Sequence, residues 1–436
     1  MASCDTKATQ TPSSAANMPD RHRRSLPLLI AAALALLLPG CAARPLPAPV
    51  AARTVPAEAR APVTILVSID GFRADYLDRG ETPNLSRLAA LGARAAMRPS
   101  FPTKTFPNHY ALVTGMRPDH NGIVDNNMED PRRPGVIFKI SNDQALDPFW
   151  WDEAEPIWIT AERSHVRTAT MFWPGAEVAH DGLRPSDWQH YDQNVTGRQR
   201  VATVIDWLRR PAATRPRFVT LYFDTVDSAG HQYGPDAPET NAAIREVDER
   251  IGDLVAGLAD LGQPADLVIV ADHGMAATSA QRVVPLESLV DPGLVHVVTD
   301  GPYSGMDALP GQENAVAAAL LRPHDHVQCW RKADIPARLH YGANPRVPAF
   351  YCLAETGWTI TRPDREPYFG GTHGYDNSSP EMLALFIASG PDFRAGVRLA
   401  TFDNVDIYPL IARLIHVQPR PSDGTIASIE GALTRP

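Results

Sequence analysis

Acidic residues follow three of the most apolar stretches of this chain. The stretches are continuous runs rich in Val, Ile, Leu and Phe: 63–69, 218–223 and 267–271. Unbroken apolar runs of this length are typical of parallel strands buried on both faces. Strands with one solvent-exposed face instead alternate apolar and polar residues. Asp70 and Asp272 follow the first and third runs directly, and Asp227 comes shortly after the second. The pattern predicts a parallel sheet whose carboxyl edge, where ligands collect in such folds, carries carboxylates.

Amphipathic helices are predicted between these strands. Pro83 suits the first turn of a helix that Thr82 can cap, and Gly92 suits its end. A longer helix is predicted to begin near Thr240, because apolar residues recur there at three- and four-residue spacing. Residues 382–388 resemble a fourth strand. The alternation predicts an α/β fold, with a mainly parallel central sheet and helices on both faces.

Residues 276–370 interrupt this alternation. They contain many prolines and few long periodic runs. We therefore predict a catalytic domain over residues 62–436 in which residues 276–370 form a smaller inserted subdomain. Cys329 and Cys352 both fall in this segment, and an oxidising compartment would allow them to form a disulfide. Two buried thiols remain the alternative.

The N-terminal 41 residues have the features of a leader and secretory signal. Three arginines between residues 21 and 24 precede an apolar run over residues 26–38. That run is shorter than the roughly 20 apolar residues that span a bilayer. Cys41 ends a Leu-Pro-Gly-Cys motif similar to a bacterial lipobox, which makes it a lipidation candidate. Ordinary cleavage nearby and an uncleaved anchor remain open.

Residues 42–61, rich in Ala and Pro, are predicted to be a flexible tether between this leader and the catalytic domain. The expected location is outside the cytoplasm of a bacterium. The protein would be either periplasmic or held at the membrane by a lipid anchor.

Seven side chains offer three carboxylates and three imidazoles, which are ligand types that zinc prefers, and one hydroxyl. They are Asp70, Thr105, Asp227, His231, Asp272, His273 and His373. Asp227 and His231 alone could be a capping pair in a loop, and Asp272 alone could cap a helix. Together, the carboxylates, imidazoles and hydroxyl could hold two ions and leave positions for a substrate. The joint occurrence of these residues at predicted strand ends and loops predicts a two-metal hydrolytic site.

Thr105 is the predicted nucleophile. A threonine hydroxyl is a poor nucleophile at neutral pH. A metal ion that lowers the pKa of its bound water to about 7 can favour the alkoxide form of a bound hydroxyl in the same way. Thr103 is the rival hydroxyl two residues away. His109 is expected to be a satisfied buried histidine or a support for the site.

Five motifs carry a family resemblance. They are Lys-Thr-Phe-Pro-Asn-His-Tyr at 104–110, Gly-Ile-Val-Asp-Asn-Asn at 122–127, Asp-Ser-Ala-Gly-His at 227–231, Ala-Asp-His-Gly-Met at 271–275 and Gly-Thr-His-Gly at 371–374. These motifs resemble those of the nucleotide pyrophosphatase/phosphodiesterase family, within the alkaline phosphatase superfamily, over roughly residues 62–420. The resemblance implies an alkaline-phosphatase-like fold.

The resemblance also implies residue roles. Thr105 would be the nucleophile. One zinc ion would be held by Asp70, Thr105, Asp272 and His273, and the other by Asp227, His231 and His373. Asn126 and the backbone N–H of Thr105 would bind a non-bridging phosphoryl oxygen. Phe106 and Tyr191 resemble the pair that sandwiches a nucleobase, and Trp173 and Tyr222 resemble the pocket wall. Ordinary core packing is the alternative for these aromatic residues.

The implied activity is cleavage of nucleotide phosphodiester or phosphoanhydride bonds. It would release nucleoside 5'-monophosphates through a covalent phosphothreonine intermediate. The alternatives are a choline or glycerol phosphodiesterase, a phosphomonoesterase or phosphonate hydrolase, and an inactive surface binding lipoprotein. The formal net charge of −9 does not favour binding to the negatively charged backbone of a nucleic-acid duplex, so the expected partner is a small molecule. The oligomeric state remains open.

Overall fold

The computed structural model describes residues 60–365 and 369–435. The predicted leader, Cys41 and most of the predicted tether lie outside these residues. The last two residues of the predicted tether, Arg60 and Ala61, contact the folded domain. Arg60 Nη1 donates a hydrogen bond to the Leu208 carbonyl (2.8 Å), and Gln263 Nε2 donates one to the Ala61 carbonyl (2.8 Å). Across the described residues, none of the helices combines the length and apolar character that crossing a bilayer requires.

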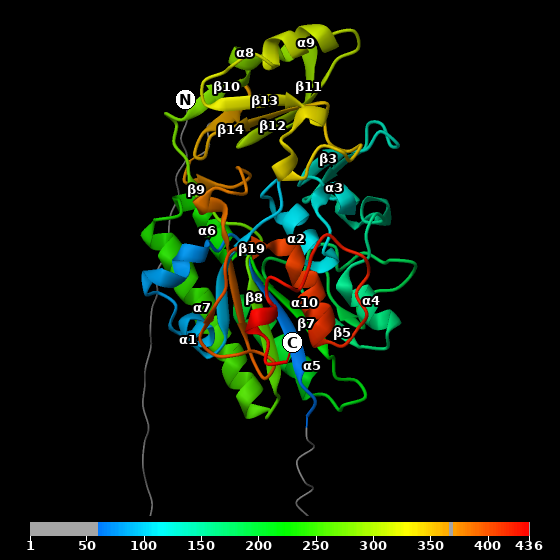
Figure 1. The fold of residues 1–436 in the computed structure, drawn as a ribbon, viewed down its shortest axis with the longest axis vertical. Helices are drawn as coiled ribbons and strands as arrows, with labels where there is room; N and C mark the ends of the chain where they lie inside the picture. The colour runs from blue at the N-terminus through cyan, green and yellow to red at the C-terminus, as the bar shows by residue number, and fades with distance from the viewer. Residues whose placement is uncertain (1–59, 366–368, 436) are drawn as a thin grey trace, which may run out of the picture. The chain divides into compact units, whose positions relative to one another are not determined.

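A mixed nine-stranded sheet forms the centre of the fold (Figure 1). The strand order is β18-β2-β17-β8-β1-β7-β5-β6, with β19 also paired to β2. The strands are β1 (Val63–Ile69), β2 (Ala93–Arg98), β5 (Thr168–Met171), β6 (Asp187–Trp188), β7 (Phe218–Phe223), β8 (Ala265–Val270), β17 (Ala384–Ser389), β18 (Val397–Arg398) and β19 (Phe402–Asp403).

The three apolar runs form the middle of this sheet. β1 lies between β7 and β8 and is parallel to both. Every residue of β1 and β7 is buried, which explains why neither run alternates with polar residues. β8 begins two residues earlier than predicted. The predicted fourth strand is β17, which is antiparallel to both β8 and β2, so the sheet is mainly but not entirely parallel.

Helices cover both faces of the sheet, as predicted. On one side α1 (Pro83–Leu91) and α5 (Gly197–Arg209) pack against α7 (Pro238–Asp260). On the other side α2 (Thr105–Thr114) and α4 (Ile157–Arg163) pack against α10 (Ile407–Leu414).

Two details of the helices differ from the sequence predictions. α1 begins at Pro83, but the Thr82 hydroxyl donates to the Leu77 carbonyl instead of capping the helix. α7 begins at Pro238, two residues before the predicted Thr240, because proline is favoured at the first helical position.

Residues 276–370 build smaller sheets within the same compact unit, residues 58–436. One is an antiparallel sheet in the order β11 (Val295–Thr299), β12 (Tyr303–Ala308), β14 (Phe350–Ala354) and β13 (Val327–Arg331). The other pairs β10 (Val283–Pro285) with β15 (Thr359–Thr361). Side chains of α9 (Glu313–Leu320) help to form a separate hydrophobic cluster with the first sheet. Cys329 and Cys352 lie opposite each other on β13 and β14 and form a disulfide.

Candidate active site

The carboxyl edge of the sheet gathers the predicted ligands. Asp70 follows β1, and Asp272 and His273 follow β8. Asp227 and His231 were expected in a loop, but both lie on α6 (Thr225–Tyr233), which comes after β7. A four-residue spacing puts two side chains on the same face of a helix, so α6 presents both to the site.

The remaining two predicted residues come from other elements. His373 follows β16 (Gly371–Thr372), which pairs with β9 (Ala276–Ala277). Thr105 is the first residue of α2. The fold therefore brings all seven predicted ligands to one edge of the sheet.

One group of ligands surrounds the imidazole of His273. Its Nε2 lies 2.9 Å from Asp272 Oδ2 and 3.5 Å from Asp70 Oδ1. The same nitrogen lies 3.3 Å from Thr105 Oγ1. These are the four residues that the family resemblance assigns to one ion.

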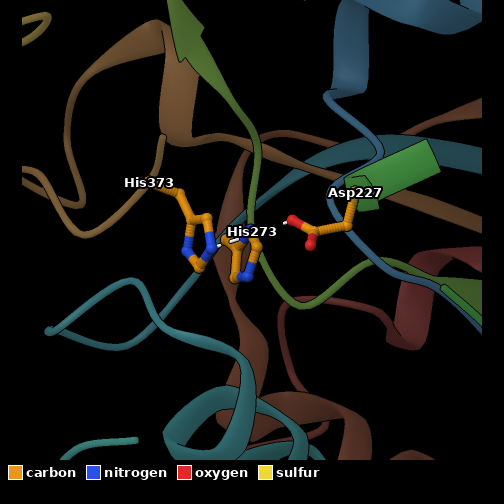
Figure 2. A group of neighbouring side chains, drawn as sticks. All are labelled: Asp227, His273 and His373. Atoms are coloured by element: carbon orange, nitrogen blue, oxygen red, sulfur yellow. Dashed lines mark ion pairs between the residues drawn. The ribbon is translucent and has the colours of Figure 1, made fainter. Parts of the chain in front are cut away.

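A second group lies beside the first. His373 Nε2 is 3.1 Å from His231 Nε2 and 3.7 Å from Asp227 Oδ1, and His231 Nε2 is 3.5 Å from Asp227 Oδ2. The His273 ring stacks on the His373 ring with 3.5 Å between their centroids, so the two groups adjoin. Figure 2 shows Asp227, His273 and His373 turned toward a common centre, and their ligand atoms lie within 4.8 Å of one another.

The carboxylates of this site fit cations. Asp70 Oδ1, Asp227 Oδ1 and Asp272 Oδ2 are buried, and none of them accepts a hydrogen bond from a residue that the structure describes. A buried, unsatisfied carboxylate oxygen is costly, and metal coordination is one of the few ways to compensate it. These oxygens indicate metal ligation more directly than the sequence motifs do.

The imidazoles are oriented for the same purpose. Each Nδ1 faces a backbone carbonyl: His231 that of Gly371 (2.9 Å), His273 that of Gly274 (2.9 Å) and His373 that of Thr103 (2.7 Å). A carbonyl requires a donor, so Nδ1 carries the proton and the Nε2 lone pair is available to a metal. The residues present fit a pair of zinc-type ions.

The electrostatics of the protein groups alone are mixed, because the neighbouring charges lower the pKa of Asp272 well below its usual value and raise that of His273 despite burial, whereas two other ligands are disfavoured as ions. Burial, followed by the charges of Asp272 and Asp227, raises the pKa of Asp70 well above its usual value. Burial, followed by the charge of His273, lowers the pKa of His373 well below its usual value. Cations at this position would favour ionised carboxylates and neutral imidazoles.

The two threonine hydroxyls occupy different environments. Thr103 is fully buried, and its hydroxyl donates to the Tyr375 carbonyl at 3.1 Å. Thr105 stands at the N-terminus of α2, where backbone N–H groups and the helix dipole favour a bound anion. Its hydroxyl, not that of Thr103, is the one beside His273.

His109 supports this arrangement from behind. Its Nδ1 lies 2.9 Å from the Thr105 carbonyl and 3.4 Å from Asp272 Oδ2, and its Nε2 lies 2.8 Å from Ser68 Oγ. It is a satisfied buried histidine that contacts the site, as expected from the sequence.

Asn126 faces the N-terminus of α2. Its Oδ1 accepts a hydrogen bond from the Phe106 backbone N–H at 2.9 Å. This bond fixes the amide and leaves the Nδ2 hydrogens for another acceptor. The geometry suits a donor to a phosphoryl oxygen held at Thr105.

A cavity of about 520 Å³ opens beside the ligands. Its lining includes Asp70, Thr105 and Asp227, and all four aromatic residues predicted for the substrate pocket: Phe106, Trp173, Tyr191 and Tyr222. Tyr222 has a second contact, because its hydroxyl donates to Asp70 Oδ2 at 2.6 Å. The volume suits a small organic molecule.

Several lining residues were not foreseen from the sequence. Ile140 borders the cavity from the turn after β4 (Ile137–Lys139), Leu146 from the end of a 3-10 helix over Asp143–Leu146, and Glu177 and His190 from other segments. Glu177 accepts a hydrogen bond from the Tyr191 backbone N–H (2.8 Å) and lies 2.6 Å from His190 Nδ1. No periodic pattern or motif marks these positions, so local sequence carried no signal for them.

An α/β sheet with a threonine at a helix N-terminus, beside a cluster of carboxylates and imidazoles, defines a metallo-hydrolase of alkaline-phosphatase-like fold. Residues 64–376 match the family model described as type I phosphodiesterase / nucleotide pyrophosphatase. The chain belongs to this family and is a nucleotide pyrophosphatase/phosphodiesterase, a hydrolase of phosphodiester and acid anhydride bonds.

Relatives agree with this assignment. A pyrophosphatase/phosphodiesterase of Schizosaccharomyces pombe is 38% identical over 387 residues, covering 85% of this chain and 79% of its own length. Mouse ectonucleotide pyrophosphatase/phosphodiesterase family member 1 is 37% identical over 398 residues, covering 87% of this chain. That match covers only 44% of the mouse protein, so the chain spans less than half of this longer relative.

Solved structures agree as well. Human ectonucleotide pyrophosphatase/phosphodiesterase 5 superposes with a TM-score of 0.82 at 32% identity, covering 85% of this chain and 100% of that one. An inactive threonine-to-alanine variant of the murine protein, in complex with AMP, has the same TM-score and identity and covers 86% of this chain and 100% of its own.

Proposed function

We propose that this protein is an exported two-zinc enzyme that cleaves phosphodiester or phosphoanhydride bonds of nucleotides and releases nucleoside 5'-monophosphates. The observation that carries the proposal is the set of three buried carboxylate oxygens without a hydrogen-bond donor among the described residues, beside three histidines whose Nε2 atoms face them. Such a set suits divalent cations, and Thr105 lies against it.

Each residue has a stated role in this proposal. Asp70, Thr105, Asp272 and His273 would hold one ion, and Asp227, His231 and His373 the other. Bound zinc supplies positive charge that favours the threonine alkoxide and stabilises charge on the phosphoryl group and leaving oxygen. The chain's own contribution is positioning and electrostatic stabilisation, as in phosphoryl transfer generally.

Thr105 acts as the nucleophile. Its Oγ gives its proton to solvent and attacks the phosphorus in line, and the bond from phosphorus to the leaving oxygen breaks. A water molecule then attacks the phosphothreonine and the Oγ–phosphorus bond breaks; one proton of the water restores the Thr105 hydroxyl, the other goes to solvent, and the nucleoside monophosphate leaves. Asn126 Nδ2 and the Thr105 backbone N–H hold a non-bridging oxygen through both steps.

Charge matching favours a diester substrate. Two dications and the three carboxylates of Asp70, Asp227 and Asp272 leave the site with one net positive charge, and with nearly none after Thr105 ionises. A monoanionic phosphodiester matches this charge better than a dianionic monoester does.

Phe106 and Tyr191 favour a nucleotide over a choline or glycerol ester. Both line the cavity next to Thr105, and the murine relative with the same fold was solved with AMP. Base–aromatic stacking contributes on the order of 1–3 kcal/mol per base. A phosphocholine ester remains the second candidate, because aromatic residues also bind quaternary ammonium groups.

A substrate panel on zinc-loaded protein tests the proposal. The panel contains a nucleoside triphosphate, a dinucleotide, a nucleotide sugar, a phosphocholine ester and a simple monoester. The nucleotide substrates should react fastest and yield nucleoside monophosphates. Faster cleavage of the phosphocholine ester would favour the second candidate, and turnover that survives complete metal removal would refute the two-zinc mechanism.

Export and lipid anchoring are also part of the proposal. The predicted signal in residues 1–41 and the oxidised Cys329–Cys352 pair are both consistent with an oxidising compartment. Mass spectrometry of the mature protein should find an acylated N-terminal Cys41, and a Cys41→Ala variant should lack it. A mature protein that begins elsewhere without lipid would refute the anchor.

A further inference from the structure

Three side chains from residues 276–370 hydrogen-bond to the stretch that leads into Asn126, two to its backbone carbonyls and one to the Asp125 carboxylate. All three are largely buried, and the stretch, residues 122–125, is buried as well. The contacts are Tyr303 Oη to Asp125 Oδ2 (2.7 Å), Tyr341 Oη to the Val124 carbonyl (3.1 Å) and Arg346 Nη1 to the Gly122 carbonyl (2.7 Å).

Arg346 also holds the far end of the same loop. It donates to the carbonyls of Trp150 (2.8 Å) and Phe149 (3.1 Å), and its Nε pairs with Asp130 Oδ2 at 2.7 Å. The segment between these contacts, which includes the short hairpin of β3 (Asn127–Glu129) and β4 (Ile137–Lys139), carries Asn126 and the cavity-lining residues 140–143, 145 and 146. Charge-assisted hydrogen bonds of a buried guanidinium are strong and directional, so Arg346 restrains the loop at both ends.

The two tyrosines are themselves held by aromatic packing. The rings of Tyr303 and Tyr351 stack with 5.0 Å between their centroids, and the Tyr341 ring packs edge-on against Tyr351 at 5.4 Å. Phe101 of the main fold contacts all three rings. A close-packed cluster fixes the direction of each hydroxyl, because fully buried rings have few alternative rotamers.

The loop also approaches Arg346 too closely to tolerate a side chain. Gly122 has φ +81°, and a Cβ placed there would lie 2.7 Å from Arg346 Nη1. Asn126, four residues later, is tied to α2 through Phe106 N–H. The amide of Asn126 is therefore fixed on one side by the nucleophile helix and on the other by the inserted segment.

We propose that Tyr303, Tyr341 and Arg346 are positioning residues for Asn126. Through them the inserted segment sets the phosphoryl-oxygen contact without touching the substrate. The inference rests on the proposed function, because the oxygen-binding role of Asn126 belongs to it. Effective oxyanion donors must be pre-oriented, so a loosened Asn126 weakens transition-state stabilisation more than substrate binding.

Removing single tyrosine hydroxyls tests the positioning role, because each change keeps the buried aromatic ring that packs in the cluster. Tyr303→Phe and Tyr341→Phe are made alone and combined with Asn126→Ala, and kcat and KM are measured on a nucleotide diester. Asn126→Ala should lower kcat about 10²–10³-fold, as loss of one oxyanion donor does. Each Tyr→Phe change should lower kcat on the order of five-fold, as loss of one hydrogen bond does, with KM nearly unchanged.

The double variants decide the mechanism. In the Asn126→Ala background neither Tyr→Phe change should lower kcat further, because the group through which they act is gone. The preference between the two diastereomers of a phosphorothioate diester should shift in the same direction for Tyr341→Phe and Asn126→Ala. Zinc content should stay at the wild-type level in every variant.

Tyr351→Phe is the matched control. Its hydroxyl is buried in the same cluster and hydrogen-bonds to none of residues 122–126 in the part of the chain that the structure describes. It should therefore keep wild-type kcat. Multiplicative effects on kcat in the double variants, or a five-fold loss of kcat in Tyr351→Phe, would overturn this inference and leave the proposed function intact. Wild-type turnover in Asn126→Ala would overturn the oxygen-binding role of Asn126 and the inference with it.

Discussion

The two halves of the proposed metal centre differ in how they meet solvent. In the half that holds Thr105, the side chains of Asp272 and His273 are 0% exposed and that of Asp70 is 2% exposed. In the other half, Asp227 is 17% and His231 39% exposed, although His373 is nearly buried. We call these the inner half and the outer half.

The difference follows from the elements that supply each half. Asp70, Asp272 and His273 leave adjacent strands of a buried sheet, and the Gly71 N–H donates to Asp272 Oδ1 at 3.2 Å. Asp227 and His231 instead project from α6 at the rim. In the proposed mechanism, the buried inner half would exert the stronger electrostatic effect on Thr105, whereas the more exposed outer half would admit water and release the leaving group.

Removal of the nucleophile should have the largest effect. Thr105→Ala should lower kcat by at least ~10⁴-fold, as loss of a nucleophile does in other hydrolases, because no covalent intermediate can form. Metal analysis should still find close to two zinc ions per chain. Thr103→Ala, at the rival hydroxyl, should retain turnover, and wild-type-like turnover in Thr105→Ala would remove Thr105 from the mechanism.

Ligand substitutions should separate the two halves. His231→Ala should lose the outer ion at limiting zinc and recover activity when zinc is added, because an open site can fill with water and exchange. Asp272→Asn should lose activity that added zinc does not restore, because its carboxylate is fully buried and lies 2.9 Å from His273 Nε2. Zinc titrations monitored by enzymatic activity measure the rescue of each variant. Equal rescue of both variants would contradict the proposed difference between the two halves.

Aromatic substitutions should affect binding more than chemistry. Phe106→Ala and Tyr191→Ala should raise KM for a nucleotide about 5- to 150-fold, corresponding to the loss of roughly 1–3 kcal/mol of stacking. Tyr233→Ala is the control, since Tyr233 is as exposed as Tyr191 but is not among the lining residues of the cavity. Unchanged nucleotide KM in both pocket variants would favour a different substrate.

The smallest effect on turnover is expected at the opposite edge of the sheet. Burial raises the pKa of Asp266, near the amino end of β8, to about 6. The folded state therefore binds a proton more tightly than the unfolded chain, so this group stabilises the fold at low pH and that contribution is lost as the pH rises from about 4 to about 6.

Asp266→Asn should remove this dependence. Compared with the variant, the wild type should lose up to about 3 kcal/mol of unfolding free energy between pH 4 and pH 7. Denaturant unfolding in the presence of chelator measures the difference without the metal contribution. A constant difference across this pH range would contradict the raised pKa, and turnover should be unchanged at neutral pH.

Much of the inner half could be predicted from sequence because its information is local. A β-branched run predicts a buried strand, and the residue that follows it must lie at the carboxyl edge of the sheet. Asp70 and Asp272 were placed in this way. The outer half was placed less well, since Asp227 and His231 were expected in a loop and lie on a helix. A nine-residue helix that is interrupted by a glycine and has few apolar residues gives little periodic signal.

The sequence by itself determined which segments form the buried central strands, the α/β class of the fold and the family, because each depends on residue type and short spacing. Only the tertiary structure decided that β17 runs antiparallel, that Thr105 and not Thr103 stands beside His273, and that the inserted segment reaches the loop before Asn126. Tyr341 and Val124 are 217 residues apart in the chain, and no local pattern encodes a hydrogen bond over that separation. Such contacts arise only when packing of the whole fold brings the two segments together.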